Sequence, residues 1–297
     1  MSLLTSIWNH PANRNRRLMA LIHALKWQCS KRLSGRSSDI TFHGLTLRCY
    51  PNSHSASRAI YFHGYPDFHE MRFIKDYLRP GDIFIDVGAN VGLYTLLAMS
   101  IVQPHGHVHS FEPGALTFQR LQQVLDLNQL TSVTSHNMAV SDTNGTVAFN
   151  NTLDDCTAHI EAESLDNSAL LSVPVVRLDT HLPDVPYAMI KLDIEGHEPF
   201  ALRGASTWLK NGNPPVIQIE MAGYSKRYGI TTSEFIQELR DCGYLTAVYS
   251  ADAHRLEWTE RPWEVPTDNV LAVFENHKQF VDHRIAAARQ ASRASSE

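Results

Sequence analysis

Apolar segments of strand length alternate with helical segments along most of this chain, and this alternation restricts its possible folds more than any other feature. Residues 83–87 (IFIDV) form an almost continuous apolar run, as expected of a parallel strand that is buried on both faces. A helix is predicted directly afterwards, over residues 91–99. The same alternation predicts strands over residues 107–112, 133–138, 188–192, 216–220, 244–249 and 270–274, shorter strands over 146–149 and 174–178, and helices over 114–128, 198–210 and 232–242. We therefore predict an α/β fold with an open, mainly parallel sheet and helices on both of its faces.

The charge of the chain is unevenly distributed. Overall composition is that of a globular protein, with 43% apolar and 19% charged residues, and the net charge is −5. The first 38 residues contain seven of the 26 cations and no Asp or Glu, which leaves a net charge of −12 on residues 39–297. No basic field covers the whole molecule, so composition does not indicate a nucleic-acid-binding protein.

The first 59 residues are interpreted as a cap on the α/β domain. Residues 40–50 have the pattern of a hairpin around Gly44, and a polar loop is expected over 51–57. Residues 13–33 are predicted to form an amphipathic helix that packs on the main domain, although a basic helix of this kind can also contact an anionic membrane surface. Its apolar positions recur at helical spacing: Leu18, Leu21, Ile22, Leu25 and Cys29.

The sequence does not predict a membrane span or a secreted protein. The longest apolar stretch near its start, residues 18–25, is too short to cross a bilayer, and no small-residue cleavage site follows it. Four cysteines (Cys29, Cys49, Cys156 and Cys242) lie far apart without a CxxC pair, which disfavours a zinc site and fits a reducing compartment. We expect a soluble, cytoplasmic protein.

A glycine-rich turn and a distant acid indicate an adenosine-containing cofactor. In open α/β sheets, ligands bind at the carboxyl ends of the strands. The strand over 83–87 ends in a turn with Gly88 and Gly92 that leads into a helix, and the next strand ends in Glu112. Glycines let a ligand lie against the backbone, and an acid at this distance can accept both hydroxyls of a ribose.

Asp86 favours a methyl donor over a dinucleotide. The turn reads DxGxNxG instead of the dinucleotide fingerprint GxGxxG. A carboxylate two residues before the first glycine would repel a pyrophosphate, whereas it would attract the ammonium group of S-adenosylmethionine. Its alternative role is to cap the helix or stabilise the turn.

The segment LDIEGHE follows the strand over 188–192 and gathers groups that can move a proton. Asp193, Glu195, His197 and Glu198 share one loop at the sheet edge where ligands bind. A carboxylate or imidazole within hydrogen-bond reach of an acceptor hydroxyl can remove its proton. We therefore propose Asp193, Glu195 and His197 as catalytic residues, while Glu198 can also serve the dipole of the following helix.

Glu220 ends the neighbouring predicted strand (VIQIE). With Asp193 it would place two carboxylates on adjacent strand ends, an arrangement that can bind Mg²⁺. These two residues are weak candidates for a metal site, and our prediction is that the reaction needs no metal.

Several of these motifs together resemble the FkbM family of S-adenosylmethionine-dependent methyltransferases. The strings FIDVGANVGLYT, SFEP, NMAVSDTNG and MIKLDIEGHEPFALRGA carry the resemblance, which covers roughly residues 60–275. It implies a class I (Rossmann-like) methyltransferase fold with a mainly parallel, seven-stranded sheet. It also implies transfer of a methyl group from S-adenosylmethionine, most often to a hydroxyl of a small molecule, natural product or sugar, with S-adenosylhomocysteine as the product.

The resemblance also implies which residues bind the donor. The turn around Gly88 would hold it, Glu112 would bind its ribose, residues 137–140 would line its adenine, and His63 would lie where family members cover its methionine tail. The implied donor-binding residues are His63, Asp86, Gly88, Ala89, Asn90, Gly92, Glu112, Pro113, Asn137, Ala139, Val140 and Asp193.

We divide the chain into a cap (1–59), a methyltransferase domain (60–276) and a terminal helix with a tail (277–297). Two alternatives remain open for its function. One is another methyl acceptor, such as a nucleic acid, although no NPPY-type or DPPY-type loop follows the fourth strand. The other is a protein that binds the adenosine cofactor without catalysis.

Overall fold

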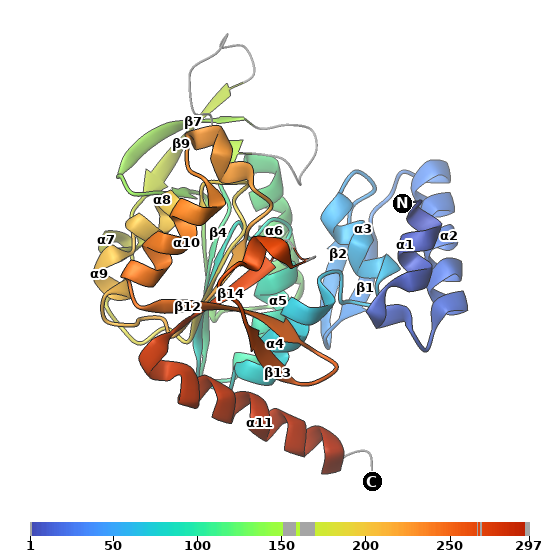
Figure 1. The fold of residues 1–297 in the computed structure, drawn as a ribbon. Helices are drawn as coiled ribbons and strands as arrows, with labels where there is room; N and C mark the ends of the chain where they lie inside the picture. The colour runs from blue at the N-terminus through green and yellow to red at the C-terminus, as the bar shows by residue number, and fades with distance from the viewer. Residues whose placement is uncertain (1, 151–158, 161–169, 266, 268, 295–297) are drawn as a thin grey trace.

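A computed structural model of the protein describes residues 2–150, 159–160, 170–265, 267 and 269–294. In this part of the chain the main sheet has eight strands in the order β13-β12-β14-β11-β10-β3-β4-β5 (Figure 1). Five neighbouring strands, β11 to β5 in this order, are parallel, and β14 runs antiparallel between β11 and β12. The strands are β3 (Ile83–Val87), β4 (His107–Phe111), β5 (Val133–His136), β10 (Met189–Leu192), β11 (Val216–Glu220), β12 (Tyr244–Ser250), β13 (Arg255–Trp258) and β14 (Asn269–Phe274).

The predicted α/β class with a mainly parallel sheet is confirmed, and its strand number is corrected from seven to eight. The additional strand is β13, at the sheet edge, where it pairs antiparallel with β12. Its sequence, RLEW, is largely exposed. The apolar pattern that marks buried strands is therefore absent there.

Helices cover both faces of this sheet, and alternate strand residues enter two separate cores. Phe84 packs with the core under α4 (Phe68–Tyr77), α5 (Leu93–Val102) and α11 (Lys278–Ala294). Ile85 and Val87 point to the other face and pack with the core under the second set of helices. That set comprises α7 (Leu178–His181), α8 (Glu198–Arg203), α9 (Ser206–Leu209) and α10 (Thr232–Asp241), and α6 (Ala115–Leu127) lies beside β5. None of the described helices combines the length and apolar character that crossing a bilayer requires.

One predicted helix is interrupted, and helix α4 was not predicted. The helix expected over 198–210 divides into α8 and α9 at Gly204. A Cβ atom at Gly204 would lie 1.9 Å from the carbonyl oxygen of Ser141, so this close approach requires glycine. Helix α4 precedes β3 in a region for which the sequence analysis predicted no element.

A second, four-stranded sheet lies beside the main one. Its order is β6-β9-β7-β8, with a small core of its own that includes Phe149 and Val175. The bounds are β6 (Ala139–Val140), β7 (Gly145–Asn150), β8 (His159–Ile160) and β9 (Leu170–Val176). The short strands predicted over 146–149 and 174–178 correspond to parts of β7 and β9, although residues 178–181 are helical.

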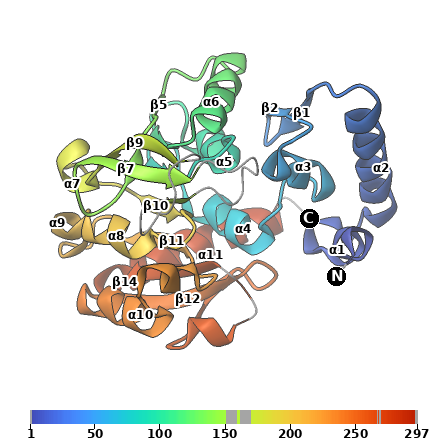
Figure 2. The same cartoon turned by 90° about the horizontal axis from the view of Figure 1, so that it is seen from above.

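The N-terminal elements stand at one side of the main sheet (Figures 1 and 2). They are α1 (Leu3–Asn9), a 3-10 turn (Pro11–Asn13), α2 (Arg17–Leu33), β1 (Ser38–Phe42), β2 (Leu45–Cys49) and α3 (His54–Tyr61). The predicted hairpin and the predicted helix are present, whereas the loop expected over 51–57 is partly helical because Ser53 caps α3. Cys29, Cys49 and Cys242 are free thiols, and Cys156 lies outside the described residues.

The division of the chain into cap, domain and tail stays a prediction. Helix α3 runs across the expected boundary at residue 59, and α11 packs against α4 of the predicted methyltransferase domain.

Candidate active site

A cleft of about 360 Å³ opens at the carboxyl ends of β3, β4, β10 and β11. The chain leaves β3 towards β4 and β5 and later returns on its other side with β10, so the strand order reverses at this point. Ligands of open α/β sheets bind at such positions. The cleft is also lined by the α3–α4 segment, through Arg58 and Asp67, and by the second sheet, through Phe149 and Ile160.

The turn after β3 exposes backbone to this cleft. Gly88 has φ of 80°, and a Cβ atom there would lie 1.9 Å from the carbonyl oxygen of Asp193. The amides of Gly88 and Ala89 both donate to the carbonyl of Phe111, which anchors the turn to β4. Gly88, Ala89 and Asn90 line the cleft, whereas Gly92 lies behind it at the start of α5.

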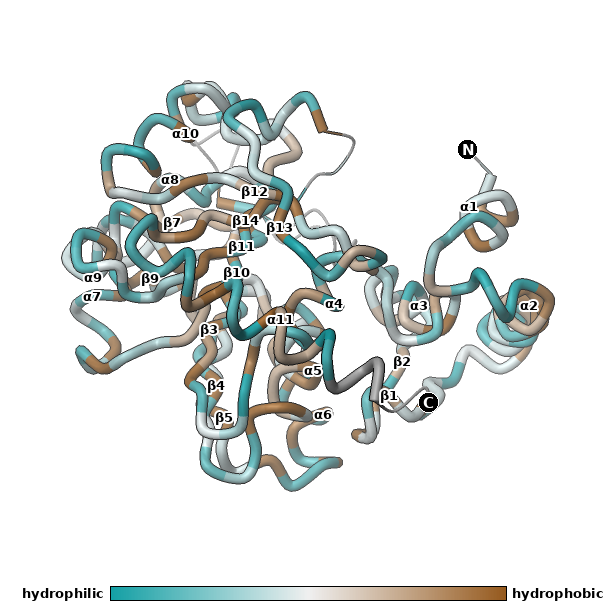
Figure 3. The backbone as a smooth tube through the Cα atoms, turned by 60° about the horizontal axis from the view of Figure 1, so that its bottom comes forward, coloured by the Kyte–Doolittle hydropathy of each residue, from teal (hydrophilic) through white to brown (hydrophobic). Residues whose placement is uncertain are grey.

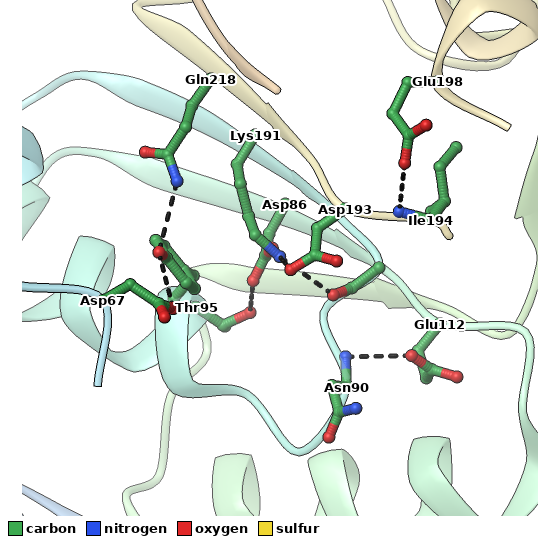
Figure 4. Close-up of polar contacts among 12 residues, drawn as sticks. Asp67, Asp86, Asn90, Thr95, Glu112, Lys191, Asp193, Ile194, Glu198 and Gln218 are labelled. Atoms are coloured by element: carbon green, nitrogen blue, oxygen red, sulfur yellow. Dashed lines mark hydrogen bonds and ion pairs between the residues drawn. The ribbon is translucent and has the colours of Figure 1, made fainter. Parts of the chain in front are cut away.

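Glu112 fixes the same turn from the end of β4. Its side chain is buried in the cleft wall and accepts a hydrogen bond from the amide of Asn90 at 2.9 Å (Figure 4). It accepts a second hydrogen bond from the amide of Gly114 at 2.8 Å. Burial raises the pKa of Glu112 to about 7. Each carboxylate oxygen retains capacity for a further hydrogen bond, so Glu112 can still accept from a ligand hydroxyl.

The predicted adenine-binding segment is only partly in the cleft. Pro113, Ala139 and Val140 line it. The side-chain amide of Asn137 donates to the carbonyls of Glu112 and Pro113, and therefore supports the loop from outside.

Asp86 lies beneath the cleft and does not line it, and its contact with the donor stays a prediction. Its side chain is fully buried and accepts a hydrogen bond from Thr95 Oγ1 at 2.7 Å. Strand register places Lys191 directly beside it, with Nζ 3.7 Å from Asp86 Oδ1 (Figure 4). The ammonium group of Lys191, not the carboxylate of Asp86, lines the cleft.

Lys191 is the central charge of this site and was missed by the sequence analysis. Nζ lies 3.1 Å from Asp193 Oδ2, donates to the carbonyl of Gly88 at 3.3 Å and stands over the ring of Tyr94. Burial alone would lower the pKa of Lys191, but the carboxylates of Asp193 and Asp86 outweigh burial and raise it, so the side chain is charged. A lysine inside the apolar strand MIKL was the available signal, because buried lysines require a charged partner.

Three carboxylates converge at the edge of the cleft. Oxygens of Asp193, Glu195 and Glu220 lie within 4.8 Å of one another, and all three residues line the cleft. Burial, together with the neighbouring carboxylates of Asp193 and Glu195, raises the pKa of Glu220 to about 10. Like charges this close favour retention of a proton in this acid cluster (Asp193, Glu195 and Glu220).

Local backbone geometry positions the acid cluster. Glu195 has φ of 58° and Gly196 has φ of 101°, so the chain reverses immediately after β10. Glu198 is buried below this turn, and its Oε1 accepts from the amides of Ile194 at 2.9 Å and Gly196 at 3.2 Å. Glu198 therefore positions the loop.

His197 lines the cleft but is almost completely buried. Its ring stacks on Phe200, and Nε2 lies 2.9 Å from Ser141 Oγ. Burial lowers the pKa of His197 to about 4, so the imidazole is neutral near neutral pH.

His63 is not near the other predicted residues. It lies on the opposite side of α3, in a separate hollow together with His23 and Trp27. His63 does not line the cleft, and its contact with the donor stays a prediction. The sequence correctly indicated that His63 precedes the main sheet. A local sequence pattern does not show on which side of the preceding helix this residue lies.

This fold, with a cleft at this position, is characteristic of the class I methyltransferases, which use S-adenosylmethionine. The model of the Methyltransferase FkbM domain matches residues 86–246. The chain belongs to the FkbM methyltransferase family, and the family predicted from its motifs is thereby confirmed.

Curated relatives and solved structures are similar to parts of the chain. Methyltransferase 1 of Beauveria bassiana is 29% identical over 148 residues, which cover 42% of this chain and 59% of that protein. The 31-O-demethyl-FK506 methyltransferase FkbM of Streptomyces tacrolimicus is 47% identical over 45 residues, 15% of this chain and 17% of that protein. The methyltransferase FkbM structure from Methylobacillus flagellatus KT has 18% identity and a TM-score of 0.43, and the match covers 73% of this chain and 54% of that chain. The chain thus spans less than two thirds of each of these proteins.

Proposed function

We propose that this methyltransferase transfers the methyl group to a hydroxyl oxygen of a small molecule, natural product or sugar. The observation that carries the proposal is the acid cluster of Asp193, Glu195 and Glu220 at the open edge of the cleft. A hydroxyl must lose its proton as it is methylated, and a positioned carboxylate can accept that proton. The name of the Streptomyces tacrolimicus relative also describes methylation at an oxygen, which supports the same class of acceptor.

The donor would bind along the turn after β3. The residues present fit an adenosine group, because Gly88 and Ala89 of the turn line the cleft and Glu112 offers buried carboxylate oxygens to a ribose. Pro113, Ala139 and Val140 would line the adenine. When bound, S-adenosylmethionine supplies the electrophilic methyl group.

The acid cluster would act on the acceptor. Glu195, next to the turn at Gly196, is the proposed proton acceptor, and Asp193 would orient the hydroxyl while paired with Lys191. His197 remains a candidate catalytic residue because it lines the cleft, although its neutral imidazole is packed against Phe200. The ammonium group of Lys191, paired with Asp193, lies where a metal cation would have to bind and would repel it. The acid cluster is therefore expected to bind a proton and not Mg²⁺.

Isotope-labelled methyl transfer tests the acceptor class. The protein is incubated with S-adenosylmethionine carrying a ¹³C-methyl group and with a panel of sugars and hydroxylated natural products, and the products are examined by NMR. The chemical shift of the transferred carbon distinguishes methyl on oxygen from methyl on nitrogen or carbon. A label found on nitrogen or carbon in the preferred product would contradict O-methylation. Adding nucleic acid to the panel tests the second acceptor class.

A further inference from the structure

Helix α2 is apolar on two opposite faces, and one of these is covered by the protein. Ala20, Ala24 and Trp27 are buried in the core beneath α2. The indole of Trp27 donates to Ser57 Oγ of α3 at 3.0 Å, which fastens this face to the cap.

The opposite face carries a row of exposed side chains, which we call the α2 stripe. Its members follow one another at spacings of four, three, four and four residues: Leu18, Ile22, Leu25, Cys29 and Leu33. The first three each precede a buried residue by two positions, which places the stripe about 200° around the helix from the covered face. Leu18, Leu25 and Leu33 are 68%, 66% and 88% exposed.

Other exposed apolar side chains gather at the same end of the molecule. Eight of the fifteen large exposed hydrophobic residues in the described part of the chain lie within residues 3–33. Helix α1, packed beside α2, contributes Leu4 and Trp8, and the guanidinium of Arg17 lies 5.5 Å from the Trp8 ring centre. Figure 3 shows apolar and polar residues alternating along both helices, which stand at the outer edge of the molecule. Such a concentration exceeds the scattered apolar exposure of ordinary surfaces.

The charges around the stripe have one sign. The first 38 residues contain seven cations and no acid, and of these cations only Arg14 forms a salt bridge in the described part of the chain, with Asp252. Arg16, His23 and Lys26 line a hollow of about 450 Å³ next to the stripe. An anionic group is therefore the complementary neighbour of this surface.

We propose that the α2 stripe and its cations bind the surface of an anionic lipid bilayer, with α2 lying in the plane of the membrane. An apolar face that enters the acyl boundary, flanked by basic residues that meet the headgroups, is the arrangement of interfacial amphipathic helices. A second copy of the chain is disfavoured, because symmetric contact through the stripe would bring two segments of seven cations together. Nucleic acid would satisfy the cations but would leave the leucines exposed.

Vesicle co-sedimentation of the full-length protein tests this proposal. Vesicles of phosphatidylcholine are compared with vesicles that also contain phosphatidylglycerol, at increasing salt concentration. We expect binding to the anionic vesicles that weakens with salt, and much weaker binding to the neutral ones. Equal binding to both kinds of vesicle, or binding to neither, would overturn the proposal.

Two variants separate the apolar and the electrostatic contributions. Leu18→Gln with Leu25→Gln should weaken binding at least about tenfold, since both side chains lose their apolar burial in the membrane. Lys26→Gln with Arg32→Gln should weaken it by about fivefold for each charge and flatten the salt dependence. Leu127→Gln, an exposed leucine of α6, is the matched control and should bind as the wild type does. Unchanged circular dichroism and methyltransferase activity in solution show that each variant is folded.

Three other results would refute the membrane as the occupant. The first is a dimer in solution that the leucine variant abolishes, because the stripe would then be a self-association face. The second is salt-sensitive binding to duplex nucleic acid together with unchanged vesicle binding by the leucine variant. The third is complete displacement from vesicles by inorganic phosphate at an ionic strength at which sodium chloride leaves the protein bound, because a free anion would then suffice.

Discussion

Replacing Lys191 by methionine tests whether its ammonium group keeps the buried carboxylate of Asp86 charged. In the wild type, Asp86 has no exposed surface, and its charge is balanced by Lys191 at 3.7 Å and by the Thr95 hydroxyl at 2.7 Å. Removing one partner of a buried ion pair typically costs about 3–5 kcal/mol, because the remaining charge is left without compensation. Lys191→Met should therefore lower the free energy of unfolding by about this amount, measured by urea unfolding.

The loss of unfolding free energy in Lys191→Met should increase as the pH rises. Burial raises the pKa of Asp86, and removal of Lys191 raises it further. A carboxyl group whose folded-state pKa is raised contributes stability below its unfolded pKa of about 3.9 and loses it as the pH rises through the folded value. The deficit of the variant should thus be small near pH 4 and should grow towards neutral pH.

Two further variants make the experiment decisive. Adding Asp86→Asn to Lys191→Met removes the unpaired charge and should recover a large part of the lost stability. Lys210→Met, at an exposed position, is the matched control and should change the free energy of unfolding by less than about 0.5 kcal/mol. A pH-independent loss, or no recovery in the double variant, would refute the assignment of Lys191 as the counter-ion.

Four predictions concern the cleft itself. Glu112→Gln should weaken S-adenosylhomocysteine binding by about 10-fold to 150-fold in calorimetry, while Glu257→Gln on the surface should not. Burial raises the pKa of Glu112 to about 7, and the carboxylate is a better hydrogen-bond acceptor than the protonated acid. The affinity of the wild type for S-adenosylhomocysteine should therefore increase as the pH rises towards that value and then level off. A flat pH profile would argue against the ribose contact. Glu195→Gln should lower turnover by about 10²–10⁴ with S-adenosylhomocysteine affinity changed less than about tenfold, whereas near-normal turnover would leave the loop with a structural role. EDTA should leave the rate unchanged, and a loss restored by Mg²⁺ would identify the acid cluster as metal ligands.

Local sequence patterns determined the class of fold and the position of the glycine turn after β3. Apolar runs of strand length and helical spacing predicted seven of the eight main strands, and the glycines after β3 with Glu112 predicted where a ligand would bind. These features follow from short-range rules of backbone conformation and burial, so they are visible in a few consecutive residues. Strand β13 was missed because its residues are largely exposed and lack the apolar run of a buried strand. Helix α4 was missed although its buried residues Met71, Ile74 and Tyr77 recur at helical spacing.

The arrangement of charges was decided by the tertiary structure. Asp86 and Lys191 are 105 positions apart in the sequence and become neighbours only through the register of β3 and β10. Glu220 joins Asp193 because β11 pairs with β10, and His63 is separated from the cleft because α3 stands between them. The second face of α2 is exposed for the same reason: the apolar pattern of the helix shows which residues can be buried, but only packing determines which of its faces receives a partner.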